Sequence, residues 1–174
     1  MVRRVAILAI ACASLFATTL EKLSLDDMVQ KSTSIVRGKV VATSSYQRGS
    51  LIYTSYQLRV SERIKGQAPD LLEVSVPGGN YGKFHQTIPG APTLLPGQEY
   101  VVFVWTGSKG INHIIGLCQG LFTVGLDAKG QTTLSRGASN AEMLDSTGRT
   151  VTDEALSMSL RDLTQRVKAQ GAGR

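Results

Sequence analysis

The sequence predicts a mostly-β domain: a small antiparallel barrel of five or six strands, preceded by a short helix and followed by an amphipathic helix. Two observations favour this fold class. Apolar and polar residues alternate along several short segments, as they do in strands with one buried face. Glycine-containing turns, not helices, separate these segments, which is typical of an antiparallel barrel or sandwich. Closure into a barrel would also leave no strand edge exposed.

Residues 1–17 are expected to form a secretory signal peptide. Two arginines precede an uncharged apolar run over residues 5–17, which ends among small residues. This order is typical of a signal peptide, and the run is shorter than the roughly 20 residues that cross a bilayer. Cleavage after Ala13 or Ala17 would export the chain to the periplasm or the extracellular space. A lipid anchor at Cys12 and a buried N-terminal helix are the alternatives.

The domain over residues 18–135 is expected to begin with a short helix. Ser24 is a good N-cap, and the acidic residues of the first turn suit the positive end of the helix dipole. The buried stripe of this helix would consist of Leu25, Met28 and Val29.

The barrel strands are expected to follow in order. Their predicted ranges are 34–44, 56–65, 71–76, 99–105, 111–118 and 121–127, with a last short strand at 131–135. Residues 56–65 alternate most cleanly, with Tyr56, Leu58, Val60 and Ile64 on the buried face. Residues 99–105 are apolar on both faces, which is typical of a central strand.

Residues 136–174 are expected to form a linker and a C-terminal helix that packs on the barrel. The linker would cover about residues 136–149, and Thr152 or Asp153 would cap the helix. One face of this helix would carry Leu156, Leu160, Leu163 and Val167. This apolar face would pack on the barrel or cover its open end; docking of a partner is the alternative.

Charge and cysteine content exclude some classes of function. Nineteen basic and 13 acidic residues give a net charge of +6, which becomes +4 without the two arginines of the signal peptide. No basic run of five or more occurs, so nucleic acid is not an indicated partner. The mature chain keeps one cysteine, Cys118, and therefore has no internal disulfide. Burial of this thiol is expected, with pairing between chains as the alternative.

The segment from Pro77 to Gln86, PGGNYGKFHQ, is the most distinctive motif. It departs from a nucleotide-binding loop, because Pro77 stands where the first glycine belongs and Phe84 stands where Ser or Thr would bind magnesium. Prolines stiffen the connection that follows, and a stiff loop loses less entropy on binding. We therefore expect a contact surface made of Gly78, Gly79, Asn80, Tyr81, Lys83 and His85.

No catalytic, cofactor or metal site is predicted. The candidate ligands of a metal or members of a thiol dyad are His85, His113 and Cys118. His113 and Cys118 stand five residues apart on one predicted strand and would point to opposite faces. A shared site of His85 with one of the other two is the alternative, and it would make the chain a thiol- or metal-dependent enzyme.

A second candidate surface is the polar face of the predicted strand 56–65. Arg59, Arg63 and Lys65 share this face, and Tyr53 stands nearby. Basic and aromatic residues on one strand face can bind an oligosaccharide or a peptide, although a solvated strand face is the simpler interpretation.

Several motifs, in order, resemble a group of exported bacterial proteins of unknown function. The motifs are IVRGKVV, IYTSYQLRVSERIKG, LEVSVPGG, LPGQEYVVFV and GLCQGLFTVGLD, over about residues 22–127. More distantly, the order of strands is similar to that of the netrin-like domain and the tissue inhibitors of metalloproteinases. These are barrels of the oligonucleotide/oligosaccharide-binding (OB) type.

The resemblance implies an OB or netrin-like barrel. The metalloproteinase inhibitors bind the protease zinc through an N-terminal cysteine in a Cys-x-Cys pair, and the mature chain, starting near Thr18, has no such cysteine. Fold without the site does not transfer the activity. The sequence therefore predicts an exported, non-enzymatic binding or interaction module of the cell envelope or secreted space. Its partner would be a protein, a peptide or an oligosaccharide, and metalloprotease inhibition is the alternative.

Overall fold

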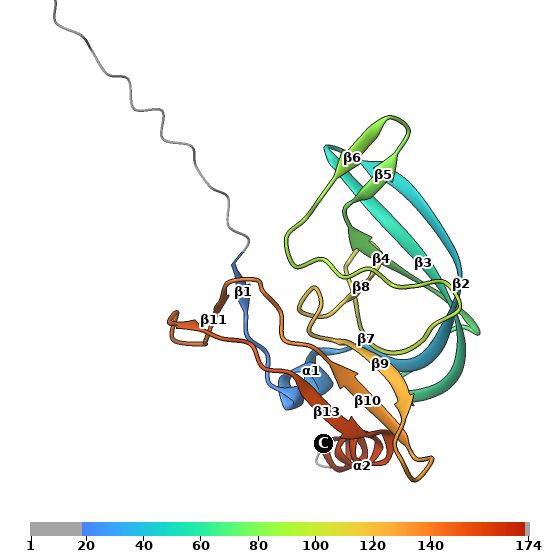
Figure 1. Cartoon of the computed structure of the whole chain (residues 1–174), viewed down its shortest axis with the longest axis vertical. Helices are drawn as coiled ribbons and strands as arrows, with labels where there is room; N and C mark the ends of the chain where they lie inside the picture. Colours follow the sequence, from blue (N-terminus) through green and yellow to red (C-terminus); the bar gives the residue numbers. More distant parts are fainter. Residues whose placement is uncertain (1–18, 173–174) are drawn as a thin grey trace, which may run out of the picture.

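The computed structural model describes residues 19–172, so the expected signal peptide and Cys12 lie outside the described residues (Figure 1). The chain is mostly β-structure, as predicted. The helices are α1 (Leu25–Lys31) and α2 (Leu160–Gly171). The strands are β1 (Leu20–Glu21), β2 (Ser34–Arg48), β3 (Leu51–Lys65), β4 (Leu71–Pro77), β5 (Gly79–Tyr81), β6 (Phe84–Gln86), β7 (Glu99–Thr106), β8 (Asn112–Ile114), β9 (Leu121–Leu126), β10 (Thr132–Arg136), β11 (Met143–Leu144), β12 (Thr150–Val151) and β13 (Leu156–Ser159).

Eight strands form one curved antiparallel sheet in the order β13-β10-β9-β7-β2-β3-β4, with β8 paired to β7 (Figure 1). The predicted closure into a barrel is not found, because no backbone ladder joins β8 to β4 within the described part of the chain. Side chains bridge this gap. Asn112 Nδ2 donates to Glu73 O at 2.9 Å, and His113 Nδ1 lies 3.2 Å from Ser75 O. The strand β8 has three residues, which is too short to pair along β4.

The long hairpin of β2 and β3 is the main element of the sheet. Each strand has 15 residues, and the two pair from Ile35↔Lys65 to Arg48↔Leu51. The predicted strands 34–44 and 56–65 stop short of its turn. The added residues include two tyrosines, Ile52 and Thr54, which are types that suit a pleated, half-buried surface.

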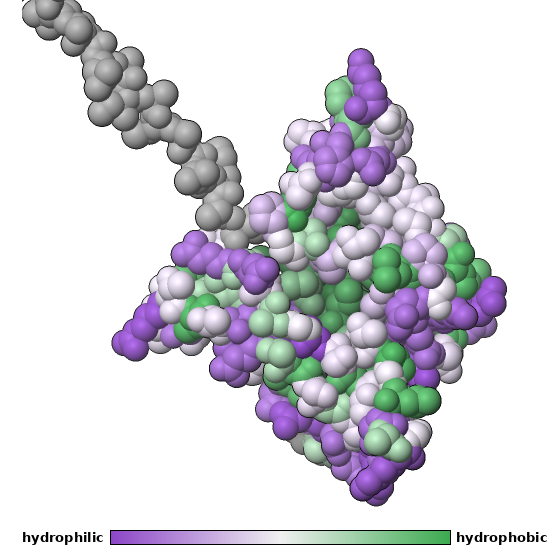
Figure 2. Space-filling model, in the orientation of Figure 1, coloured by the Kyte–Doolittle hydropathy of each residue, from purple (hydrophilic) through white to green (hydrophobic). Residues whose placement is uncertain are grey.

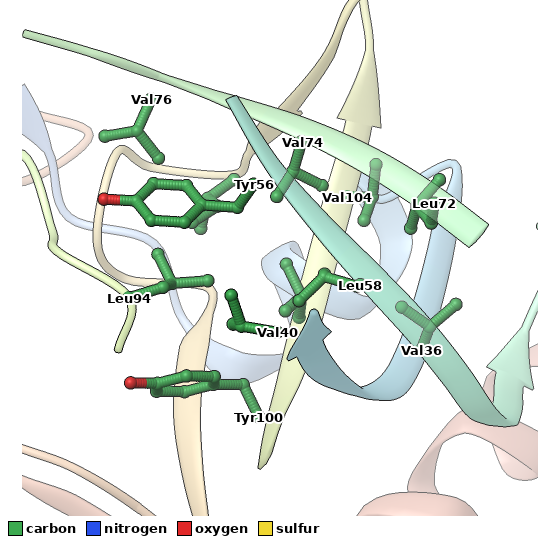
Figure 3. Close-up of a cluster of buried hydrophobic side chains, with 12 residues drawn as sticks. Val36, Val40, Tyr56, Leu58, Leu72, Val74, Val76, Leu94, Tyr100 and Val104 are labelled. Atoms are coloured by element: carbon green, nitrogen blue, oxygen red, sulfur yellow. The ribbon is translucent and has the colours of Figure 1, made fainter. Parts of the chain in front are cut away.

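An inner core lies on one face of the curved sheet and contains side chains from β2, β3, β4, β7 and β8 (Figure 3). Of the residues predicted to point inward from β3, Tyr56 and Leu58 belong to this core and Val60 packs against it, whereas Ile64, beyond the register shifts between β2 and β3, packs against the outer core described next. Its buried members are Val36, Val40, Tyr56, Leu58, Leu72, Val74, Val76, Leu94, Tyr100, Val102, Val104 and Ile114. This core fills part of the space that the sheet encloses. Two of its members, Tyr56 and Val76, also line the pocket described below.

An outer core lies on the opposite face of β2 and β7, under α1 and α2. Val101 and Phe103 of β7 point into it, whereas Val102 and Val104 point into the inner core. The central-strand interpretation of residues 99–105 is therefore confirmed. The other buried members of the outer core are Leu23, Met28, Val29, Ile35, Ile115, Phe122, Leu134, Leu163 and Val167.

The C-terminal helix begins later than predicted. Its N-cap is Ser159, whose hydroxyl accepts a hydrogen bond from the backbone N–H of Asp162. Residues 156–159 instead form β13, which pairs with β10. Leu156 and Leu160 also fit a two-residue period with Met158. The helical spacing alone therefore placed the start of the helix too early, within the strand β13. Packing of Leu163 and Val167 on the sheet is confirmed.

The helix α1 begins at Ser24, as predicted. The Ser24 hydroxyl accepts from Asp27 N at 3.0 Å, and the Asp27 carboxylate accepts from Ser24 N at 3.1 Å, which completes a capping box. Met28 and Val29 are buried, while Leu25 is partly buried. Across the described residues, neither helix has the length and apolar content needed to cross a membrane.

Residues 136–149, expected as a surface linker, contain part of a small second sheet. In this sheet β11 pairs in parallel with β1 and antiparallel with β12. The side chain of Met143 is fully buried. Gln119, also fully buried, links this region to the main sheet, because its amide oxygen accepts from Leu23 N and its amide nitrogen donates to Glu21 O, both at 2.8 Å.

Candidate binding site under the β5–β6 hairpin

The distinctive segment PGGNYGKFHQ forms the β5–β6 hairpin. Asn80 pairs with His85, Tyr81 pairs with Phe84, and Gly82 and Lys83 make the turn. The six residues predicted as a contact surface thus lie on this hairpin or directly before it. Within that set Gly78 is buried, Gly79 is partly buried, and Asn80, Tyr81, Lys83 and His85 are exposed.

Hydrogen bonds hold the base of the hairpin on β3. Gly78 N donates to Ile52 O at 2.7 Å, and the Thr54 hydroxyl donates to Gly78 O at 2.8 Å. Ile52 N donates to the side-chain oxygen of Gln86 at 2.7 Å. The backbone of Gly79 (φ +126°) lies so close to β3 that a Cβ atom there would stand 2.2 Å from the Thr54 hydroxyl oxygen. Only glycine fits at this point.

A pocket of about 400 Å³ lies between this hairpin, the following loop and the inner face of β2 and β3. Its floor is continuous with the inner core, because Tyr56 and Val76 belong to both. Its walls include Thr43, Ser45, Thr54, Pro77, Gly78, Gly79, Asn80, His85, Gln86, Thr87, Ile88, Ala91, Pro92 and Thr93.

The lining of the pocket combines hydroxyl and amide groups with apolar side chains and one histidine ring. No Asp, Glu, Lys or Arg is among the residues that line it. Thr43 and Ser45 of β2 and Thr54 of β3 present hydroxyl groups, and Ser44, which stands between the first two, pairs with Ser55 and faces the other side of the sheet. Such a lining can exchange hydrogen bonds with a neutral ligand without burying a charge.

His85 stands at the rim of this pocket in a fixed orientation. Its Nδ1 atom lies 2.6 Å from the Asn80 side-chain oxygen, and its Nε2 atom lies 3.0 Å from the Thr87 hydroxyl. Both ring nitrogens are therefore engaged in hydrogen bonds across the hairpin and the loop. The ring is placed to form one wall of the pocket.

The phenol of Tyr56 is kept neutral at the floor. Only 5% of this residue is exposed. Burial raises the pKa of Tyr56 above its ordinary value, outweighing the lowering effect of a hydrogen bond at the backbone of Leu94. Figure 3 shows the rings of Tyr56 and Tyr100 on either side of Leu94, with their hydroxyl groups pointing the same way. The Tyr56 side chain thus adds no charge to the floor, and little of its ring is open to a ligand.

His113 and Cys118 lie elsewhere and do not share a strand, which corrects the sequence-based geometry. The strand β8 ends at Ile114, and Cys118 lies in the turn beyond Leu117, whose backbone is left-handed (φ 64°). Cys118 is partly rather than fully buried and lines a different pocket of about 380 Å³ with Arg136 and Ser139. Across residues 19–172, no group of three or more His, Cys, Asp or Glu is placed to hold a metal ion.

The predicted basic face of β3 is largely occupied by internal contacts. Arg63 Nη2 lies 2.5 Å from the Asp70 carboxylate, and Arg63 Nε donates to Ala68 O. Lys65 Nζ donates to backbone oxygens at the end of α1, and the ring of Tyr53 stacks on Tyr46 with their centroids 5.5 Å apart. Arg63 and Lys65 are thus engaged in contacts within the chain, while Arg59 is exposed.

Comparisons with known proteins leave the fold and the pocket as the basis for function. No protein-family model matches the chain, and neither a curated protein nor a solved structure matches it. The resemblance to exported proteins of unknown function and to netrin-like domains therefore stays an expectation drawn from sequence motifs.

Proposed function

We propose that the chain is an exported, non-enzymatic binding module of the cell envelope or secreted space, and that the pocket under the β5–β6 hairpin is its ligand site. The ligand we propose is an uncharged, hydroxyl-rich molecule, with a neutral oligosaccharide as the class. Export is supported by the expected signal peptide over residues 1–17.

The uncharged lining is the observation that carries this proposal. A charged ligand in this pocket would lose hydration without gaining an ion pair, which is costly. A sugar exchanges its hydrogen bonds to water for hydrogen bonds to hydroxyl and amide groups. Thr43 and Ser45 of β2 and Asn80 of the β5–β6 hairpin supply such groups to the pocket.

The size and floor of the pocket agree with a small ligand or one end of a chain. Its volume of about 400 Å³ is within the range of about 300 to 1,000 Å³ that is typical of ligand pockets. Tyr56 lies at the floor but is only 5% exposed, so hydroxyl and amide groups of the walls would make the contacts to a sugar. The motif resemblance to OB-type domains supports the same class, because that fold class binds oligosaccharides.

Metalloprotease inhibition stays the alternative hypothesis, and the described residues give it no added support. The cysteine of the expected mature chain, Cys118, lies in a turn of the folded domain and not at an N-terminus. A metalloprotease panel whose activity falls on adding the purified protein would revive this alternative.

Two alanine variants on one strand test the proposed site. Ser45 faces the pocket, while the neighbouring Ser44 faces the opposite side of the sheet. After a screen of the purified protein on an array of neutral and charged oligosaccharides, the best binder is titrated by calorimetry. We expect Ser45→Ala to weaken binding about threefold to tenfold, the value of one hydrogen bond. Ser44→Ala serves as the matched control and should bind as the wild type does.

Two results would contradict the proposal. One is an array on which only charged oligosaccharides bind. The other is an equal loss of affinity in the Ser44 and Ser45 variants, which would place the ligand outside this pocket.

A further inference from the structure

Carboxylates are absent from the end of the molecule that carries the two hairpin turns. Residues 39–61 and 74–98 contain no Asp or Glu, although the chain has 13 of these residues. The first range covers most of the β2–β3 hairpin, and the second covers the β5–β6 hairpin and the loop after it. Arg48 at one turn and Lys83 at the other are exposed. This end therefore presents positive charge with no acidic residue beside it.

Large apolar side chains are exposed at the same two turns. Tyr81 and Phe84, on either side of the β5–β6 turn, are 44% and 57% exposed, and Leu51 at the β2–β3 turn is 38% exposed. Lys83 Nζ lies 5.6 Å from the centroid of the Phe84 ring. None of the three apolar side chains belongs to either core. Packing in the two cores therefore does not explain why these three positions carry large apolar side chains.

The two turns lie side by side at one extreme of the longest axis (Figure 1). A flat surface could therefore touch both without meeting the rest of the molecule. Figure 2 shows hydrophobic and hydrophilic side chains next to one another at this end. Aromatic side chains beside basic ones are the combination that membrane–water interfaces favour.

We propose that these two turns form a docking tip, defined by Arg48, Leu51, Tyr81, Lys83 and Phe84, that binds the surface of an anionic lipid bilayer. The aromatic rings insert at the level of the headgroups, and the two cations pair with lipid phosphates. A bilayer is favoured over an acidic protein because a stable protein interface needs roughly 800 Å² on each partner, whereas two narrow turns project here.

The docking tip is separate from the ligand pocket, although one hairpin carries both. The pocket is lined from the base of the hairpin by Gly78, Gly79, Asn80 and His85, while the tip projects from its turn. Docking by the tip would hold the pocket close to the membrane. The inference does not rest on the proposed ligand, because the pocket residues take no part in it.

Vesicle sedimentation of the full chain tests the docking tip. The vesicles are phosphatidylcholine alone or an equal mixture of phosphatidylcholine and phosphatidylglycerol, at low salt. We expect binding to the anionic vesicles to fall about tenfold or more in the double variant Tyr81→Ser/Phe84→Ser. The control is Leu126→Ser, which removes a side chain that is 72% exposed at the β9–β10 turn, at the opposite end of Figure 1. The apolar run of residues 5–17 is common to all variants.

A fluorescent reporter shows where the bilayer touches the protein. Trp105 is the one tryptophan of the chain, so a Trp105→Phe background allows a new tryptophan to report alone. With Phe84→Trp we expect the emission to shift to the blue on adding anionic vesicles, and with Leu126→Trp we expect no shift.

Three outcomes would overturn this inference. The first is wild-type binding by the double variant when circular dichroism shows it to be folded. The second is an emission shift at position 84 that neutral vesicles produce equally. The third is a shift at position 84 that soluble polyglutamate produces and anionic vesicles do not, which would identify an acidic polymer as the partner.

Discussion

Gly79 is the residue of the candidate site that tolerates least change. It has a positive φ of +126°, and a Cβ atom there would stand 2.2 Å from the Thr54 hydroxyl oxygen. Gly82 in the turn of the same hairpin also has a positive φ, of +58°, but a Cβ atom there would meet nothing within 4 Å. Gly79 thus combines a φ that is nearly restricted to glycine with close packing, whereas at Gly82 only the milder left-handed conformation opposes a side chain.

We expect Gly79→Ala to lower the free energy of unfolding by about 2–4 kcal/mol, because strain and a steric clash add. Gly82→Ala should cost about 1 kcal/mol, since only the left-handed conformation opposes it. Urea unfolding followed by circular dichroism measures both. Equal costs would show that contact with Thr54 does not fix the hairpin.

The ion pair of Arg136 and Asp153 fastens the segment before β13 to β10. The Arg136 Nη1 atom lies 2.5 Å from Asp153 Oδ2, and Ser139 N donates to the same oxygen at 2.8 Å. The two side chains are 7% and 1% exposed. Burial raises the pKa of Asp153. The hydrogen bonds from Arg136 and Ser139 lower this pKa by a larger amount, so it lies below its ordinary value.

We expect Asp153→Asn to lower the free energy of unfolding by about 3–5 kcal/mol at neutral pH, since it leaves the Arg136 charge buried without its partner. A depressed pKa contributes stability above the unfolded-state value, about 3.9, that is lost as pH falls through the lower folded-state value. The gap between wild type and variant should therefore narrow below about pH 4. Chemical unfolding over a pH series measures this.

The control for this prediction is Glu99→Gln. The Glu99 carboxylate pairs with Arg37, and the two side chains are 30% and 25% exposed. We expect a cost of about 1 kcal/mol or less for this partly exposed pair. A cost for Asp153→Asn as small as this one, or one that does not change with pH, would contradict the role given to the buried pair.

Single residues explain why only part of the site could be predicted from the sequence. The glycines, the lysine and the histidine of PGGNYGKFHQ mark an unusual turn, and the structure places them on one hairpin. Thr43, Ser45 and Thr54 lie outside this motif, and their local sequence does not distinguish them. Ser45 and Thr54 also lie outside the predicted strand ranges 34–44 and 56–65. Their facing into one pocket follows from the extended hairpin, which the local pattern did not reveal. The partners of Lys65 likewise depend on long-range contacts, whereas Arg63 pairs with Ala68 and Asp70 nearby in the sequence.

At the scale of elements, α1 shows how one strand supports a helix. Lys65 Nζ of β3 donates to the backbone oxygens of Val29, Gln30 and Ser32 at 2.5, 3.1 and 2.6 Å. A cation near the last carbonyl groups satisfies acceptors that the helix leaves open and complements its dipole. The helix has only seven residues, so these hydrogen bonds are expected to contribute a large share of its stability.

We expect Lys65→Met to lower the free energy of unfolding by about 1–3 kcal/mol, because carbonyl groups lose a charged donor while the apolar stem is kept. Arg59→Met, an exposed position on the same strand, should change it by about 0.5 kcal/mol or less. Urea unfolding of the two variants decides between them. A cost at Arg59 as large as that at Lys65 would contradict the role given to the Lys65 contacts.

Elements with a single clear period were predictable, and elements with mixed periods were not. Strands β4 and β7 follow their alternation or their continuous apolar run, and β3 follows its alternation as far as Val60. The start of α2 was missed because Leu156 and Met158 fit a strand while Leu156, Leu160 and Leu163 also fit a helix. Pairing with β10 decided the outcome. Tertiary contacts of this kind override local propensity.

At the scale of the whole molecule, the sheet divides the interior into two cores and stays open beside β8. The inner core fills the space enclosed by β2, β3 and β4, and the outer core holds both helices. The mostly-β class could be predicted from strand patterns. The open side of the sheet could not be predicted, because it depends on where β8 ends. The backbone turns away from this strand at Gly116 and Leu117, which are both left-handed.

Export from the cytoplasm is the prediction that follows from the expected signal peptide over residues 1–17. Produced in a bacterial host, the protein should be found outside the cytoplasm with an N-terminus at Ser14 or Thr18, and Leu8→Arg should block export by placing a charge in the apolar run. Cell fractionation and mass spectrometry of the N-terminus check this. An intact Met1 in the cytoplasm would contradict export, and a lipid-modified Cys12 would favour the anchored form.

The binding of a neutral ligand in the pocket under the β5–β6 hairpin is the central claim, and amide chemical shifts test it most directly. Isotope-labelled protein is titrated with the neutral oligosaccharides that bind on the array. We predict shifts that saturate and that concentrate at Ser45, Thr54, Asn80 and His85, with little change around Cys118 or α2. Shifts that gather around Cys118 or on α2 instead, or no saturable shift with any neutral oligosaccharide, would contradict the claim.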